Sequence, residues 1–133
     1  MFSIKRRVCF ADTDAGGITY HSKYLDFCEQ ARLEFLIKRG ITQRKLWYDY
    51  NIMMVLRSCS IKYLRPTHAE DLLKVTVENI VIKGPLIKIR QNIYDDEGNL
   101  TTECDIELVV VEFGTMKLIR KIDDKLLGCL GLD

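Results

Sequence analysis

The strongest periodic pattern in the chain lies in its first third, where apolar residues recur every three or four positions. After Ser22, a residue type that caps helices, this spacing runs from Tyr24 to Phe35 with charged residues between. Further leucines widen the apolar face, which indicates a helix enclosed by protein on several sides. Lys38-Arg39-Gly40 supplies two cations and then a glycine, so one long helix is expected to end there.

Most of the remaining chain alternates apolar and polar residues, as strands do. The alternation predicts strands over residues 3–11, 52–65, 72–83, 86–94, 100–113 and 116–122, a short helix over 42–50, and a loose helix or tail after 123. Gly84-Pro85 and the acidic run Asp95-Asp96-Glu97-Gly98-Asn99 read as short turns, which join antiparallel neighbours because parallel strands need longer crossovers. We therefore expect a meander, with strands adjacent in chain order.

These elements predict an α+β fold in which a curved antiparallel sheet of about five strands wraps one long central helix. A chain of 133 residues has the size of a single domain, so residues 1–133 are expected to form one domain. Such a sheet leaves an edge and its outer face uncovered, and we expect a homo-oligomer to cover them.

Composition and charge exclude several classes of protein. The formal net charge is +1, and the basic cluster Lys5-Arg6-Arg7 runs straight into apolar residues, so no nucleic-acid site is indicated. No run approaches the roughly 18 apolar residues of a spanning helix, which predicts no membrane insertion. Five cysteines without a C-x-x-C pair, beside only two histidines, favour neither a zinc site nor disulfides, and predict free thiols in the cytoplasm.

Candidate chemistry concentrates in residues 10–24, where two carboxylates, two glycines and a histidine precede the helix. A calcium loop would need a carboxylate where Lys23 stands, and no phosphate-binding glycine motif is present, so neither is predicted. Asp14 near a helix N-terminus suits acyl chemistry, because free amides there can polarise a carbonyl while the carboxylate attacks or directs water. The residues alone favour a plain turn, with Asp12 and Asp14 bonded to backbone and His21 in the first helical turn.

A longer pattern changes this balance. The run D-T-D-A-G-G-I-T-Y-H-S-K-Y-L-D-F-C-E-Q-A-R-L-E-F-L, residues 12–36, resembles the signature of hotdog-fold acyl-CoA thioesterases of the 4-hydroxybenzoyl-CoA thioesterase family, especially the branch associated with the Tol-Pal system. The matching positions include Asp14, Gly16, Gly17, His21, Tyr24, Glu29 and Arg32, with weaker agreement at Arg57, Tyr63 and Pro66. The resemblance implies a hotdog fold, a dimer or tetramer with sites between subunits, and hydrolysis of an acyl-CoA, or of an acyl carrier protein thioester, without a cofactor.

The same resemblance implies roles for individual residues. It makes Asp14 the catalytic carboxylate, as nucleophile or general base, and it implicates His21 in orienting the substrate or assisting at the thioester. Backbone N–H groups from Tyr20 to Ser22 would form the oxyanion site. Phe10 departs from the family pattern, which often has tyrosine at this position, and we expect that change to tune rate or substrate.

Substrate contacts are expected from Gly16, Gly17, Tyr20, Tyr24, Lys83 and Lys88. The glycines would let backbone approach the substrate closely, and the lysines around the Gly84 turn could meet the phosphates of coenzyme A. Cys28 and the Glu29–Arg32 pair are expected to be structural. Two other functions on the same fold stay open: an acyl-thioester hydratase, whose histidine, proline and glycine signature is absent around His21, and a non-catalytic acyl-thioester binding module.

Overall fold

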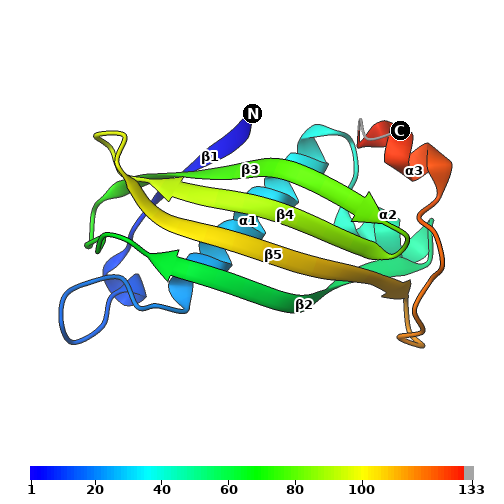
Figure 1. Ribbon diagram of the computed structural model, residues 1–133, viewed down its shortest axis with the longest axis horizontal. Helices are drawn as coiled ribbons and strands as arrows, with labels where there is room; N and C mark the ends of the chain where they lie inside the picture. Colours follow the sequence, from blue (N-terminus) through cyan, green and yellow to red (C-terminus); the bar gives the residue numbers. More distant parts are fainter. Residues whose placement is uncertain (131–133) are drawn as a thin grey trace.

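A five-stranded antiparallel sheet and the helix that crosses its inner face make up most of the chain (Figure 1). The computed structural model describes residues 1–130. The strands are β1 (Phe2–Arg7), β2 (Ile52–Tyr63), β3 (Leu72–Lys83), β4 (Leu86–Tyr94) and β5 (Leu100–Glu112), and the helices are α1 (Lys23–Lys38), α2 (Gln43–Tyr48) and α3 (Asp124–Cys129), with a 3₁₀ turn, η1, at Phe10–Asp12. This is the hotdog arrangement that the resemblance implies.

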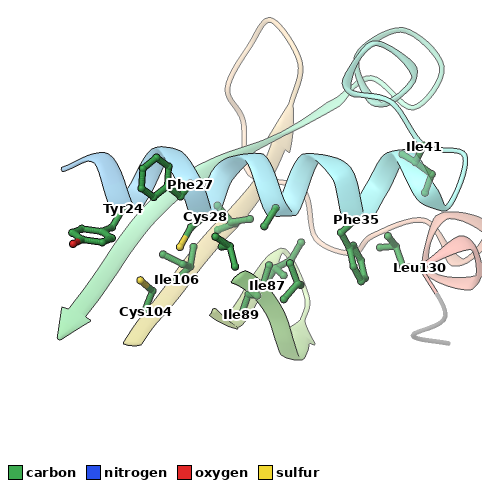
Figure 2. Packing of buried hydrophobic residues seen from close by; sticks show 14 of the residues in the cluster. Tyr24, Phe27, Cys28, Phe35, Ile41, Ile87, Ile89, Cys104, Ile106 and Leu130 are labelled. Carbon is green, nitrogen blue, oxygen red and sulfur yellow. The ribbon is translucent and has the colours of Figure 1, made fainter. Parts of the chain in front are cut away.

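Helix α1 has the apolar face that its spacing predicts. Its buried residues are Tyr24, Phe27, Cys28, Ala31 and Phe35. Figure 2 shows Tyr24, Cys28 and Phe35 directed toward the strands, on the side where Ile87, Ile89, Cys104 and Ile106 lie. With 16 residues the helix spans about 24 Å, an ordinary rather than a long helix. Within residues 1–130, no helix is both long and apolar enough to cross a membrane.

The strands alternate as half-buried strands do, and β4 shows this most clearly. Ile87, Ile89 and Ile93 are buried, whereas Lys88 lies exposed and Arg90 lies partly exposed between them. Because successive side chains point to opposite faces, the isoleucines pack under α1 and the cations face outward. The predicted bounds of β3 and β4 are confirmed residue for residue, and β2, β5 and α2 agree within two residues.

One predicted strand is too long, and another is absent. The first strand ends at Arg7 rather than at residue 11, because the chain turns into η1, where the amide of Cys9 donates to the carboxylate of Asp12. Residues 116–122 form no strand: their backbone joins β5 at an isolated bridge between Val111 and Leu118, and Ile122 is buried in the core. Beyond residue 123 the predicted loose helix is α3, and the end of the tail, residues 131–133, lies outside the described residues.

The predicted meander order is also wrong for one strand. The sheet runs β1-β3-β4-β5-β2, so β3, β4 and β5 form a meander while β2 lies at the far edge beside β5. Strands β2 and β3 are thus three strand spacings apart, about 14 Å. The connection over residues 64–71 is long enough to cross that distance, whereas the turns at 84–85 and 95–99 leave no such freedom.

Candidate active site

Residues 12–22 form a loop between η1 and α1, and the buried carboxylate of Asp12 supports it. Oδ2 of Asp12 accepts a hydrogen bond from the amide of Cys9 at 2.9 Å, and its carbonyl accepts one from the amide of Tyr20 at 2.8 Å. An isolated bridge between Thr13 and Thr19 closes the loop. Asp12 therefore has the structural role that a plain turn predicts, and its side chain is 6% exposed.

Asp14 differs from Asp12 because its side chain is exposed at the tip of the same loop. Its Oδ1 accepts a hydrogen bond from the amide of Gly16 at 2.8 Å, and its own amide donates to the carbonyl of Ile18 at 2.9 Å. Gly17 follows with φ +81°, a backbone angle that favours glycine, and its amide donates to the carbonyl of Asp14. The loop thus holds the carboxylate by one oxygen and leaves the other toward solvent.

Asp14 lines a cleft of about 330 Å³ at the end of the sheet where α1 begins. Three segments that are distant in sequence meet there: the 12–22 loop, the first turn of α1, and the chain from the end of β2 into the connection to β3 (Figure 1). The lining residues are Asp14, Ile18, Thr19, His21, Tyr24, Tyr63, Leu64, Arg65 and Pro66. Of the predicted site residues, the structure therefore brings Asp14, His21 and Tyr24 together.

The start of α1, which adjoins this cleft, leaves amide donors free. Ser22 occupies the N-cap position, as its residue type predicts, but its side chain makes no capping hydrogen bond. Among the described residues the amides of His21 and Ser22 have no acceptor, whereas the amide of Lys23 donates to the carbonyl of Tyr20 at 2.9 Å. Free N–H groups at the positive end of a 16-residue helix are suited to a negatively charged oxygen.

Tyr24 lines the cleft but is buried, with 3% of its surface exposed. Its hydroxyl shares a hydrogen bond of 2.9 Å with Oγ1 of Thr67, which lies 2.6 Å from the hydroxyl of Thr19. Thr67 is a residue that sequence reasoning missed, and its place between a proline and a histidine carried no signal for burial. This buried trio ties the helix start to the β2–β3 connection.

Tyr20, Gly16 and Gly17 lie in the loop without lining the cleft. The ring of Tyr20 is 43% exposed and contacts the ring of His21, with 4.3 Å between ring centroids. The lack of a side chain at Gly16 leaves room for the Asp14 carboxylate, because a Cβ at this position would lie 3.2 Å from Oδ1 of Asp14.

Lys83 and Lys88 are not brought to Asp14 within one chain. Lys83 pairs with Leu86 at one end of β4. Tyr63, which lines the cleft, pairs with Thr102 of β5, and Thr102 pairs in turn with Ile93 near the other end of β4. Leu86 and Ile93 are seven residues apart, about 23 Å along the strand. Lys83 therefore belongs to the opposite end of the sheet.

Lys88 projects from the outer face of the sheet. Its Nζ lies 3.5 Å from Oε1 of Glu107, and Arg90 on the same face forms a two-bond pair with Asp105 at 2.7 and 3.1 Å. The Asp105 hydrogen bonds raise the pKa of Arg90 above its usual value. The outer face of the sheet thus carries several ion pairs, and Lys88 takes part in one of them.

A second cavity, of about 260 Å³, lies along one side of α1, between Leu25 and Leu36. Its walls are largely aliphatic, from α1, β2, β3, β4 and β5, with Asp26, Glu29 and Arg32 as its charged residues. Arg32 donates to the side-chain oxygen of Gln91 at 2.8 Å, rather than forming the ion pair expected with Glu29, and burial lowers its pKa. This groove is apolar enough to receive a hydrocarbon or aromatic group.

Cys28 is buried and structural, as predicted, and is a poor nucleophile. It is 0% exposed and faces Cys104 of β5 (Figure 2). The hydrogen bond to Cys104, together with burial, raises the pKa of Cys28 far above that of a free thiol, so it stays protonated. Within residues 1–130, histidine, cysteine and carboxylate side chains do not gather in a group of three that could hold a metal ion.

Comparison with known proteins gives matches along almost the whole chain. The model of the thioesterase-like superfamily matches residues 8–128. An acyl-CoA thioesterase, YbgC, from Haemophilus influenzae is 34% identical over 116 residues, which cover 87% of this chain and 85% of that protein. A 1,4-dihydroxy-2-naphthoyl-CoA hydrolase from Thermosynechococcus vestitus is 27% identical over 95 residues, covering 71% of this chain and 65% of that protein.

The fold comparison agrees. The crystal structure of a hypothetical protein from Aquifex aeolicus superimposes with a TM-score of 0.88 at 26% identity, covering 98% of this chain and 99% of that one. Sequence similarity to a named thioesterase and backbone similarity to this solved structure therefore each cover most of the chain.

Proposed function

Because the chain belongs to the thioesterase-like superfamily, we propose that it is a thioester hydrolase that cleaves an acyl-CoA to the free acid and coenzyme A. The observation that carries the proposal is that the exposed carboxylate of Asp14 and His21 line one cleft beside the start of α1, where the amides of His21 and Ser22 are unbonded. A general base or nucleophile beside candidate oxyanion donors is what acyl transfer to water requires.

In the proposed reaction the thioester carbonyl oxygen lies at the amides of His21 and Ser22. As general base, Asp14 takes a proton from the attacking water and the leaving thiolate receives that proton when the tetrahedral intermediate collapses and the carbon–sulfur bond breaks. As nucleophile, Asp14 attacks the carbonyl carbon, the carbon–sulfur bond breaks to leave a mixed anhydride on Asp14, and water then hydrolyses the anhydride to the free acid, with the released proton going to the thiolate. His21 lines the same cleft and would orient the thioester.

The decisive experiment follows thiol release from acyl-CoAs of graded chain length, with an aromatic acyl-CoA included, for wild type and Asp14→Asn. The substitution keeps the shape of the side chain, and we expect turnover to fall about 10²- to 10⁴-fold, the range typical of lost acid–base catalysis. Asp96→Asn, in the exposed β4–β5 turn, is the matched control and should retain wild-type turnover.

Three outcomes separate the alternatives. Wild-type turnover by Asp14→Asn would remove Asp14 from the mechanism. No turnover by the wild type, with tight acyl-CoA binding retained, would indicate a non-catalytic binding module. Hydrolysis of acyl carrier protein thioesters alone would identify the carrier and leave the chemistry intact.

We further propose that two copies pair through β2. This strand has 12 residues and pairs only on the side facing β5, so its other edge is open. Leu56 is 46% exposed on it, and Tyr63 and Leu64 at its end are each 51% exposed. Long, partly apolar edges pair with other strands, and antiparallel pairing of two β2 strands has the two-fold symmetry of a dimer.

Such a dimer would place the partner's Lys83 at the Asp14 end of the sheet, because each β2 runs opposite to the other. Lys83 remains our candidate for the coenzyme A phosphates on this basis, with the site shared between subunits. Sedimentation of the active enzyme tests the arrangement: a catalytically active monomer would refute it, and a tetramer would indicate a further pairing of dimers. The five free thiols also support the cytoplasm as the site of action.

A further inference from the structure

Arg32 lines the apolar groove beside α1, and a buried amide holds its guanidinium there. Phe35 of α1 and Ile87 and Ile89 of β4, seen in Figure 2, form part of the groove walls. Nη1 of Arg32 donates a hydrogen bond to Oε1 of Gln91 at 2.8 Å. Because the amide is neutral, this hydrogen bond positions the guanidinium without balancing its charge.

Gln91 is itself fixed, since it is 0% exposed and its whole side-chain amide is hydrogen-bonded. Its Nε2 donates to the carbonyl of Cys28 at 3.0 Å and to the carbonyl of Thr76 at 3.1 Å. With both N–H groups engaged on that side, the amide oxygen is directed to Arg32. A long and otherwise flexible cation is therefore held at one place on the groove wall.

The charge of Arg32 lacks a carboxylate partner within residues 1–130. Among these residues it forms no ion pair, although Glu29 lies three positions earlier on α1 and is exposed to solvent. Burial lowers the pKa of Arg32, as it does for a cation that is partly removed from water. A half-buried guanidinium in these surroundings is stabilised by an anion that reaches its remaining N–H donors.

The groove limits the size and the character of such an anion. Its volume of about 260 Å³ has room for about nine heavy atoms, at the roughly 30 Å³ that a water molecule occupies in the liquid. Its walls are largely aliphatic, and its two acidic residues, Asp26 and Glu29, are both exposed. A guanidinium matches a carboxylate, and aliphatic walls match a hydrocarbon or aromatic tail.

We propose that this groove binds a small apolar monocarboxylate of about eight to ten heavy atoms, with its carboxylate on Arg32 and its tail against the aliphatic walls. The site is distinct from the cleft of Asp14, with which it shares no lining residue. The proposal goes beyond the proposed hydrolysis and does not depend on it, although acids of this class are among the products that such a reaction releases.

The test is a methyl NMR titration with two matched pairs of ligands, octanoate with octanamide and benzoate with benzamide. Within each pair the shape is the same, and only the acid carries a charge. We expect the wild type to bind at least one acid about tenfold to 100-fold more tightly than its amide, the range for hydrogen bonds to a charged group. The aliphatic and aromatic pairs identify the tail that the walls accept.

Arg32→Gln should abolish this preference and leave the affinity for the amide within about twofold of the wild-type value, because the neutral ligand does not use the charge. Retained binding of the amide also shows that the variant is folded. Arg44→Gln is the matched control, since Arg44 is exposed on α2 and does not line the groove, and it should keep the preference for the acid.

The same titrations locate the ligand. Methyl shifts should centre on Ile80 and Ile82 of the groove rather than on Ile18 of the Asp14 cleft. No binding of either acid, equal affinity of the wild type for acid and amide, an equal loss of both ligands in Arg32→Gln, or shifts centred on Ile18 would each overturn the proposal. Turnover is not measured here, so a failure of the proposed hydrolysis would leave the binding result intact.

Discussion

Alanine at Gly16 and at Gly17 should produce opposite defects, although the two residues are neighbours in the loop that carries Asp14. A Cβ at Gly16 would lie 3.2 Å from Oδ1 of Asp14, tighter than ordinary contact, while the backbone there is not left-handed. A Cβ at Gly17 would meet no atom within 4 Å, but φ is +81°. Gly16→Ala therefore presses on the proposed catalytic carboxylate, and Gly17→Ala strains the backbone.

The magnitudes follow from these two geometries. A non-glycine residue in the left-handed region costs about 1–2 kcal/mol. Unfolding entropy of about 2.1 cal/mol/K per residue gives about 0.28 kcal/mol/K for this chain, so Gly17→Ala should lower Tm by about 4–7 °C. Gly16→Ala should change stability by less than about 1 kcal/mol, because the stiffer unfolded chain offsets the contact.

The effect on catalysis should run the other way. A misplacement of 1 Å can cost about 100-fold in rate, so a shift of a few tenths of an ångström in Asp14 should lower kcat about fourfold to tenfold in Gly16→Ala. Thermal unfolding by calorimetry and thiol release from one good acyl-CoA measure both quantities. Wild-type kcat in Gly16→Ala would refute the reacting role of Asp14, and an unchanged Tm in Gly17→Ala would refute the strain argument.

Two further predictions concern stability. Gln91 is fully buried, and its side-chain amide donates hydrogen bonds to the carbonyls of Cys28 and Thr76. Gln91→Leu should therefore lower the free energy of unfolding, measured in urea, by about 2–4 kcal/mol, whereas Gln43→Leu at an exposed position should change it by less than about 0.5 kcal/mol. Equal effects of the two substitutions would count against a stabilising role for the buried hydrogen bonds. Hydrogen bonds from Asn99 lower the pKa of Asp95 in the folded protein. The ionised carboxylate therefore stabilises the turn above the unfolded pKa of about 3.9, and this contribution is lost as pH falls through the folded pKa. The loss of Tm caused by Asp95→Asn should be present at pH 7 and shrink toward pH 2, and a loss of Tm that does not depend on pH would contradict this reasoning.

Local chemistry in the sequence was enough to predict most elements. The three-to-four spacing from Tyr24 to Phe35 specified the buried face of α1, and period-two alternation located β3 and β4 to the residue. These signals act between residues close in sequence, where a helix turn or a pleat sets which side chains share a face. The loop containing Asp14 was equally visible, because carboxylates beside adjacent glycines mark a turn before a helix.

Long-range placement could not be predicted in this way. Any strand edge can bond to any other, so alternation alone did not show that β2 lies beside β5 at the far edge rather than beside β3. For the same reason the alternation over 116–122 predicted a strand, although this segment forms only an isolated bridge with β5.

The sequence by itself showed that Asp14 stands in a glycine-containing turn just before a helix, and through its family resemblance it predicted Asp14 as the catalytic carboxylate. Only the tertiary structure decided what surrounds it: Tyr63 and Thr67 reach the helix start because the β2–β3 connection crosses the sheet end, and Lys83, at the end of β3, lies about 23 Å away along the strand direction. The reason is physical, since side-chain type and local spacing are encoded residue by residue, whereas distances between remote segments come from how the whole sheet pairs and curves.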